Sequence, residues 1–380
     1  MGAKGLEHYL DNSATTAVSR AAADKAYRIM TEVYGNPSSL HNKGLDAEHE
    51  LERARKAVAA RLRVSPGELY FTSGGTEANN TALFGAAHAN ARERRRIVIS
   101  AVEHSSVTEA AAQLEAEGFE VVQIQPQSDG MVHAGDVAAA VDKHTALVSV
   151  MLVNNETGAI MPVADIFNAV KEINPAALCH TDAVQAFGKL DIKAKSLGAD
   201  MISVSGHKVH APKGVGALYV KKGVRLVPHV FGGEQEGRFR PGTEPLPAIA
   251  AFGVACDEFD VLGNYENVAA LNRYARENLL QIGGIVLNSP ENALPYVLNF
   301  SAGRVRSETM LHFLEEREVY VSSGSACAKG KPSHVLRALG LSRDRADSAL
   351  RVSFSKYNTT ADIDALCEGI ALGLKVLAHR

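Results

Sequence analysis

The sequence predicts an α/β protein, in which a large domain with a mainly parallel sheet of about seven strands is joined to a smaller α+β domain. The first observation is that short β-branched runs alternate with longer Ala-rich amphipathic segments between about residues 68 and 220. That alternation is typical of parallel strands joined by crossover helices. The second is a change of pattern after Pro241, and the third is the length of 380 residues, which leaves room for about two or three domains.

The strands expected in the large domain are short apolar runs bounded by turn residues. They are Glu68–Thr72, Ile97–Ala101, Glu120–Gln125, Leu147–Val153, Leu178–Thr181, Met201–Ser205 and Ala217–Val220. The helices expected between them are Thr76–Ala91, Ser105–Ala116, Val137–Lys143 and Val163–Ile173. Each helix is long enough to return the chain to a parallel neighbour.

The smaller domain is expected to begin with a long helical stretch near Ala248–Leu280 and to close with a helix from Ala361. Its strand runs are Ile285–Asn288, Tyr296–Phe300, Val319–Ser322 and Leu350–Ser353. We place the large domain at residues 14–250 and the small domain at residues 1–13 and 251–380. We expect the two domains to pack together, with a cleft between them where ligands bind.

Composition excludes several classes of protein. Forty Lys and Arg stand against 43 Asp and Glu, a net charge of −3, so we expect no direct binding of nucleic acid through a general positive charge. No apolar run reaches the roughly 18 residues of a membrane span, so we expect a cytoplasmic protein. The four cysteines lack zinc-site spacing, so we expect no metal and a reducing compartment.

A Gly-rich turn follows the first expected strand, at Thr72-Ser73-Gly74-Gly75-Thr76-Glu77. Two glycines let backbone N–H groups converge at a helix start, and Thr76 adds a hydroxyl group, so the turn suits a phosphate. It is neither the dinucleotide-binding fingerprint nor a P-loop, so no nucleotide is implied. Taken alone, a Gly-Gly turn is more often an ordinary strand-to-helix connection.

Lys208 and Asp182 follow two other expected strands, at what should be the same edge of the sheet. A partly desolvated lysine amine can form a Schiff base, although a single lysine is more often an ordinary loop residue. A carboxylate can keep a pyridinium nitrogen protonated. Together with the phosphate cradle, these two residues match pyridoxal phosphate.

Three further side chains complete the predicted site. Cys327 lies between glycines near Lys329 and Lys331, which favours its reactive thiolate, whereas the other three cysteines lie in apolar patterns typical of core residues. Arg351 rises from a strand-like run and suits a bidentate grip on a carboxylate, although a surface salt bridge fits this segment equally well. His104 could stack on a flat cofactor and exchange protons, although an isolated histidine is more often a core residue.

Short motifs occur in order along almost the whole chain. They are Tyr9–Thr16, Asn36–Ser39, Thr72–Asn80, His104–Val107, Asn154–Gly158, Asp182–Gly188, Ser205–Gly216, Arg240–Glu244 and Ser322–Cys327. In these motifs the sequence resembles the pyridoxal-phosphate cysteine desulfurases of the NifS/IscS type, within the class V aminotransferase group. The resemblance implies the fold of the type I pyridoxal-phosphate enzymes.

The resemblance also implies roles for individual residues. Lys208 would carry the cofactor as a Schiff base and remove the Cα proton of L-cysteine, and the Cys327 thiolate would take the substrate sulfur as a persulfide, releasing L-alanine. Asp182 would pair with the ring nitrogen, and His104 would stack on the ring. The other implied contacts are Gln185 and Asn155 on the ring-oxygen side, Gly75, Thr76, Ser205 and His207 at the phosphate, the partner subunit's Thr243 at the phosphate in a homodimer, and Arg351 with Asn155 at the substrate.

Other activities stay open at this point. A selenocysteine lyase would share nearly every cofactor residue, whereas an ordinary aminotransferase has no use for the thiol of Cys327. A non-catalytic assembly subunit would not need Lys208, Asp182, His104 and Cys327 together.

The sulfur acceptor is the least determined partner. Only four residues, 328–331, separate Cys327 from Pro332, and the chain stops at Arg380. Both features are shorter than we associate with the housekeeping iron–sulfur members of the family. We therefore expect a sulfur-acceptor protein in iron–sulfur cluster assembly, tRNA thiolation or another pathway.

Overall fold

A seven-stranded sheet with the order β2-β8-β7-β6-β5-β3-β4 forms the centre of the computed structural model, which describes residues 7–303, 305–323 and 333–377. Its strands are β2 (Leu69–Thr72), β3 (Arg96–Ser100), β4 (Glu120–Ile124), β5 (Thr145–Ser149), β6 (Leu178–Asp182), β7 (Met201–Ser205) and β8 (Gly216–Val220). The strands from β4 to β7 pair in parallel, and β8 is antiparallel to both β7 and β2. The predicted mainly parallel sheet is confirmed.

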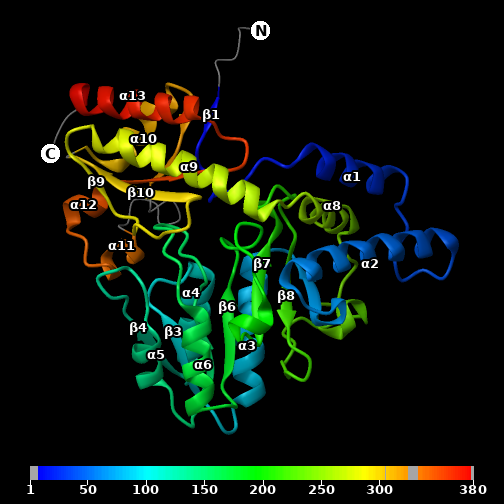
Figure 1. The fold of residues 1–380 in the computed structure, drawn as a ribbon. Coiled ribbons are helices and arrows are strands. Elements are labelled where there is room, and N and C mark those ends of the chain that lie inside the picture. The colour runs from blue at the N-terminus through cyan, green and yellow to red at the C-terminus, as the bar shows by residue number, and fades with distance from the viewer. Residues whose placement is uncertain (1–6, 304, 324–332, 378–380) are drawn as a thin grey trace.

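Helices cover both faces of this sheet (Figure 1). They are α3 (Gly75–Asn90), α4 (Ser105–Ala116), α5 (Ala134–Ala140), α6 (Val163–Ile173) and the short α7 (Ala194–Leu197). Ile97 and Ile99 of β3 join a core cluster with α3 and α4, whereas Val98 between them joins a second cluster that includes α6. Because successive residues of a strand point to opposite faces, the apolar run of β3 fills both layers. The predicted helix Val137–Lys143 begins and ends earlier, as α5.

Two N-terminal helices, α1 (Arg20–Thr31) and α2 (Asn42–Leu62), were not predicted. Both pack against α8 (Leu246–Asp257) beside the large sheet (Figure 1). Ser19 caps α1 by accepting a hydrogen bond from the Ala22 N–H group at 3.3 Å. The short 3-10 helices are η1 (Pro66–Glu68), η2 (Gly206–Lys208) and η3 (Gln235–Arg238).

The C-terminal third of the chain forms a four-stranded antiparallel sheet, of order β12-β13-β10-β9. Its elements are α9 (Val261–Leu280), β9 (Ile285–Leu287), β10 (Val297–Ala302), α10 (Ser307–Glu315), β11 (Val319–Tyr320), β12 (Ser322–Ser323), α11 (His334–Ala338), α12 (Arg343–Asp347), β13 (Ala349–Ser353) and α13 (Thr360–Val376). Figure 1 shows α9, α10 and α13 beside this sheet. The domain boundaries at residues 13 and 250 stay predictions.

Two elements of the C-terminal third differ from the prediction. The single helical stretch near Ala248–Leu280 is two helices, because Asp260 starts α9 by accepting a hydrogen bond from the Gly263 N–H group at 3.1 Å, and Phe259 in the break packs edge-on against Phe187. The single run Val319–Ser322 is two strands. Of these, β11 pairs with β1 (His8–Tyr9), whereas β12 pairs with β13.

The N-terminal segment lies between the two larger sheets. Asp11 forms a β-bridge with Ser353 at the end of β13, and the Ser13 N–H group donates to the Ser353 hydroxyl group at 2.7 Å. Farther along, the Thr16 N–H group donates to the His207 carbonyl at 2.9 Å. Residues 11–16 therefore connect the small sheet to the segment that follows β7.

None of the helices described combines the length and apolar composition that a membrane crossing requires.

Candidate active site

The large sheet brings the predicted site residues to one edge. β2 and β7 run in the same direction because both are antiparallel to β8, and β6, β5 and β3 are parallel to β7. Asp182 is the last residue of β6, and the segments that follow the other strands carry Gly75, Lys208, Asn155 and His104. The carboxyl edge of such a sheet is where α/β proteins bind ligands.

The Gly-rich turn after β2 forms an unoccluded helix start. Gly74 has a φ of +154°, which residues with a Cβ rarely adopt, and no side chain caps the first turn of α3 behind it. The Ser205 hydroxyl group beside this turn is buried and lacks a hydrogen-bond partner among the described residues. Exposed Thr76 adds a second hydroxyl group. Orphaned helix N–H groups and an unpaired buried hydroxyl group suit a phosphate.

His207 lies on the same edge, and its Nδ1 is 3.2 Å from the Thr15 hydroxyl group. Burial, together with the positive charges of Lys208, Lys213 and Lys189, lowers the pKa of His207 to about 4. Its imidazole is therefore neutral at pH 7 and offers an N–H group rather than a charge.

We expect Gly216→Ala to disrupt this cradle. A Cβ at Gly216 would lie 2.6 Å from the Val204 carbonyl oxygen and 2.7 Å from the Gly74 Cα, both backbone atoms. The free energy of unfolding should fall by about 1–3 kcal/mol, as for other overpacked sites. Urea denaturation measures this, with Gly67→Ala as the matched control, since nothing lies within 4 Å of its added Cβ. Equal stability of the two variants would contradict the crowding at Gly216.

Lys208 is half-buried on η2, directly after β7. Its Nζ donates to the carbonyl groups of Ser13 and Ala14 at 2.6 and 2.7 Å. The amine is thus held at the sheet edge by the N-terminal segment, which the sequence motifs did not identify as a binding partner.

A chain of hydrogen bonds connects Asp182 with His104. The Asn79 Nδ2 donates to Asp182 Oδ2 at 2.6 Å and to Ser106 Oγ at 2.8 Å, and Ser106 Oγ lies 2.8 Å from His104 Nδ1. The Val184 N–H group donates to the other oxygen of Asp182 at 2.9 Å. Asp182, Asn79 and Ser106 are buried. The carboxyl group and the imidazole are therefore fixed relative to each other.

The tautomer of His104 follows from its contacts. Its Nδ1 accepts a hydrogen bond from the Ser106 N–H group at 3.1 Å, so the proton of the neutral ring lies on Nε2. Burial lowers the pKa of His104, the charge of Asp182 opposes that shift, and the charges of Lys208 and His334 add to it. His104 is therefore a neutral ring that can move a proton only through Nε2.

Arg351 is buried rather than part of a surface salt bridge. Its Nη2 donates to Asp11 Oδ1 at 2.9 Å, and its Nη1 donates to the Asn155 carbonyl at 3.1 Å. Its Nε is buried and has no hydrogen-bond partner in the described part of the chain. The guanidinium group thus retains an unsatisfied donor beside Asn155, as a site for a small carboxylate requires.

Two buried acids near the site were missed by the sequence analysis. Burial raises the pKa of Glu103 to about 8, although hydrogen bonds from the Ser100 hydroxyl group at 2.5 Å and the Met151 N–H group at 2.7 Å oppose that shift. Burial likewise raises the pKa of Glu156 to about 7, against a 2.6 Å hydrogen bond from Ser333. Both acids hold neighbouring loops in place.

Cys327 lies outside the described residues. The cysteines at positions 179 and 256 are buried, as predicted, whereas Cys367 on α13 is only partly buried and packs against the edge of the core. Burial raises the pKa of Cys179 to about 12 and that of Cys367 to about 11, and it also raises the pKa of Cys256. All three are therefore protonated thiols at pH 7 and poor nucleophiles.

Thr243 is exposed, and within the described ranges no hydrogen bond joins it to the other predicted site residues. Its loop is nonetheless tied to the phosphate cradle. The Arg240 Nε donates to Glu77 Oε1 at 2.9 Å, and Glu77 Oε2 accepts a hydrogen bond from the Ser73 N–H group at 2.7 Å.

Comparisons with known proteins identify the family of this chain. Residues 8–366 match the family model described as aminotransferase class-V. The chain is 38% identical over 365 residues to the cysteine desulfurase IscS of Methanosarcina thermophila, covering 95% of this chain and 90% of that protein. It is 37% identical over 382 residues to the cysteine desulfurase IscS of Vibrio vulnificus strain CMCP6, covering 98% and 94% of the two chains.

Solved structures show the same relationship. A protein described as NifS-like superposes with a TM-score of 0.93 at 35% identity, covering 98% of this chain and all of that one. A structure described as SspA in complex with cysteine superposes with a TM-score of 0.83 at 34% identity, covering 93% of this chain and all of that one. The chain therefore belongs to the class-V aminotransferase family.

Proposed function

We propose that this protein is a pyridoxal-phosphate-dependent cysteine desulfurase, which converts L-cysteine to L-alanine and receives the sulfur on Cys327. One observation carries the proposal: the Lys208 amine, the Asp182 carboxyl group and the Gly-rich turn suited to a phosphate all lie at the same edge of the sheet. The desulfurase names of the IscS relatives, and the cysteine named in the SspA structure, support the choice of substrate.

The residues present suit the cofactor. The unpaired Ser205 hydroxyl group, the uncapped turn at Gly75 and Thr76, and the neutral His207 would hold its phosphate. Asp182 would hold the ring nitrogen and Gln185 the ring-oxygen side. When bound through Lys208, pyridoxal phosphate supplies an electron sink for negative charge at the substrate Cα.

The chain's own residues would orient the substrate and move its proton. We assign the substrate carboxylate to Arg351, whose buried Nε has no partner among the described residues, and place Asn155 beside it. The Lys208 amine would take the proton from Cα, since two carbonyl groups hold it at the sheet edge. His104 would cover the ring and exchange a proton through Nε2.

Sulfur transfer would follow at Cys327. The thiolate attacks the substrate sulfur, so a sulfur–sulfur bond forms as the carbon–sulfur bond breaks. The electron pair of the broken bond stays on the substrate carbon, which then takes up a proton to give L-alanine. The high pKa values of Cys179, Cys256 and Cys367 support Cys327 as the nucleophile, because those three remain thiols.

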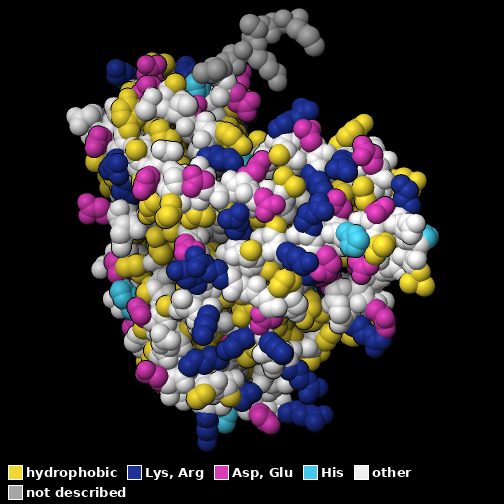
Figure 2. Space-filling view, turned by 45° about the vertical axis from the view of Figure 1, so that its right-hand side comes forward, with side chains coloured by type: hydrophobic (Ala, Val, Ile, Leu, Met, Phe, Trp, Pro, Cys, Tyr) yellow, Lys and Arg dark blue, Asp and Glu magenta, His cyan; other side chains and the backbone are white. Residues whose placement is uncertain are grey.

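We further propose a homodimer in which the partner subunit's Thr243 reaches the phosphate. Large apolar side chains are exposed along α1 and the turn before α2, namely Tyr27, Met30, Tyr34 and Leu40, the last fully exposed. Figure 2 shows apolar side chains on the side of the molecule that α1 and α2 form. Apolar surface of this kind marks protein contacts.

The test of the function is incubation of the cofactor-loaded protein with L-cysteine. We expect L-alanine, and mass spectrometry should find one added sulfur on the peptide that contains Cys327. Sulfur on Cys179, Cys256 or Cys367 instead, or an amino group passed to a keto acid, would contradict the proposal. The same assay of the Cys327→Ser protein on both L-cysteine and L-selenocysteine separates a selenocysteine lyase from a desulfurase, since the two differ in whether the thiol is essential.

A further inference from the structure

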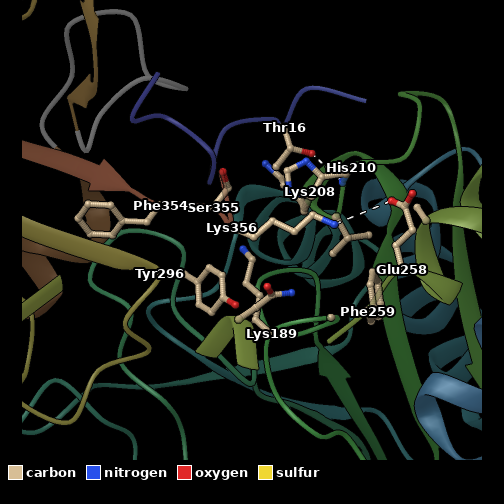
Figure 3. Close-up of a pocket in the computed structure, with 14 residues that line it drawn as sticks. Thr16, Lys189, Lys208, His210, Glu258, Phe259, Tyr296, Phe354, Ser355 and Lys356 are labelled. Carbon is tan, nitrogen blue, oxygen red and sulfur yellow. Dashed lines mark hydrogen bonds and ion pairs between the residues drawn. The ribbon is translucent and has the colours of Figure 1, made fainter. Parts of the chain in front are cut away.

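Lys189 is a buried lysine to which the proposed reaction assigns no role. It follows Gly188 in the loop after β6, and 5% of its surface is exposed. Figure 3 shows its side chain beside Tyr296, across a pocket from Thr16 and His210, and Lys208 also lines this pocket. A lysine is seldom buried so completely unless its amine is hydrogen-bonded or paired.

The Lys189 amine contacts the predicted cofactor residue Gln185. Its Nζ donates to Gln185 Oε1 at 3.2 Å, and Gln185 Nε2 donates to the Ser13 carbonyl at 3.0 Å. That same carbonyl accepts the 2.6 Å hydrogen bond from Lys208 Nζ. An unbroken path of hydrogen bonds therefore leads from Lys189 through Gln185 and Ser13 to the proposed reactive amine.

This path fixes which way the Gln185 amide faces. A protonated lysine amine can only donate, so the amide oxygen must face Lys189. A backbone carbonyl can only accept, so the amide nitrogen must face Ser13. Since Gln185 is 4% exposed, water is not at hand to satisfy a reversed amide.

We propose that Lys189 is a positioning residue that keeps the amide nitrogen of Gln185, rather than its oxygen, on the side of Ser13 and Lys208. The inference rests on the proposed cofactor chemistry, in which Gln185 meets the ring-oxygen side. An N–H donor there stabilises a negatively charged ring oxygen, whereas a carbonyl oxygen would repel it. Lys189 acts through Gln185 and touches neither substrate nor cofactor.

The groups around Lys189 determine the pH range in which its amine is protonated. Burial, together with the positive charges of Lys208 and Arg351, lowers the pKa of Lys189 to about 7. Other titratable groups line the same pocket: Lys356, paired with Glu258 at 3.9 Å, His210, whose pKa burial lowers, and Tyr296, whose pKa burial raises. Below about pH 7 Lys189 thus adds a positive charge near Lys208.

The test is a pH titration of the visible absorbance of the cofactor-loaded protein, which reports protonation at its link to Lys208. We expect Lys189→Met to raise this pKa by about 1, because the Gln185 amide is free to reverse. Lys189→Arg, which keeps a donor, should restore most of the wild-type value. Lys193→Met is the matched control, since Lys193 is exposed and its amine is paired with exposed Asp191 at 3.4 Å.

A double mutant distinguishes positioning from a direct effect of charge. If Lys189 acts through Gln185, Lys189→Met should add little to the pKa of a Gln185→Leu protein. A shift of equal size in the wild-type and Gln185→Leu backgrounds would overturn the inference, as would no shift at all. Wild-type protein that takes up no cofactor would refute the proposed function itself, so the two failures are distinguishable.

Discussion

Lys208→Ala should yield a colourless protein after incubation with pyridoxal phosphate, and L-alanine production should fall by at least about 1,000-fold. The amine of Lys208 is the proposed point of covalent attachment and the proposed base for the Cα proton, so one substitution removes both. The Ala14 carbonyl would lose the hydrogen bond from Lys208, and the Ser13 carbonyl would keep only the one from Gln185. Absorbance spectroscopy and alanine quantification measure the two losses separately.

Lys213→Ala is the matched control for this variant. Lys213 lies five positions downstream of Lys208, is exposed, and should tolerate the change in both assays. Cofactor colour that survives in the Lys208→Ala protein would place the attachment elsewhere. Borohydride reduction and peptide mapping would then show whether another lysine of the same pocket, Lys189 or Lys356, carries the cofactor.

Cys327→Ser should retain the cofactor and its colour but lose desulfuration, with L-alanine production from L-cysteine reduced by about 100-fold or more. A serine hydroxyl group is not ionised near pH 7 and does not accept sulfur, whereas a cysteine thiolate does. Cofactor binding should persist because none of its proposed ligands changes.

The control for Cys327→Ser is Cys367→Ser, because Cys367 is the least buried of the three cysteines that the structure describes. Its activity should match that of the wild type. Unchanged alanine formation in Cys327→Ser would remove Cys327 from the mechanism. Loss of activity toward L-cysteine with retained activity toward L-selenocysteine would be the behaviour of a protein that can act as a selenocysteine lyase.

The sequence predicts the large sheet well because its strands are short apolar runs separated by helices of clear amphipathic pattern. It does not predict α1 and α2. Buried positions of α2 include a glutamate, Glu50, whose carboxylate is paired with Lys25 at 2.7 Å, and an apolar-periodicity criterion counts such a residue as exposed. The break at Phe259 is missed for a related reason, since an aromatic residue in a helical pattern does not reveal that it packs into another element.

The motifs predict the residues proposed to contact the cofactor directly, but they do not predict the residues that hold those side chains in position. Asp182 and Lys208 are recognisable because a strand precedes each of them. Asn79 and Lys189 are not, since a polar residue in a helix or loop carries no sequence signal of being buried. Asn79 matters because it contacts Asp182, more than 100 positions away in the sequence. Lys189 matters because it reaches Ser13 through Gln185.

The crossing of the N-terminal segment between the two larger sheets has a consequence for biosynthesis. Ser13 accepts from Lys208 through its carbonyl group and donates through its N–H group to the hydroxyl group of Ser353, 340 positions later in the chain. The ribosome releases the N-terminal segment first, yet its partner strand β13 is synthesised some 340 residues later. The nascent chain therefore acquires the complete proposed cofactor pocket only after β13 has been synthesised, and a product truncated before β13 should neither bind pyridoxal phosphate nor release reactive sulfur.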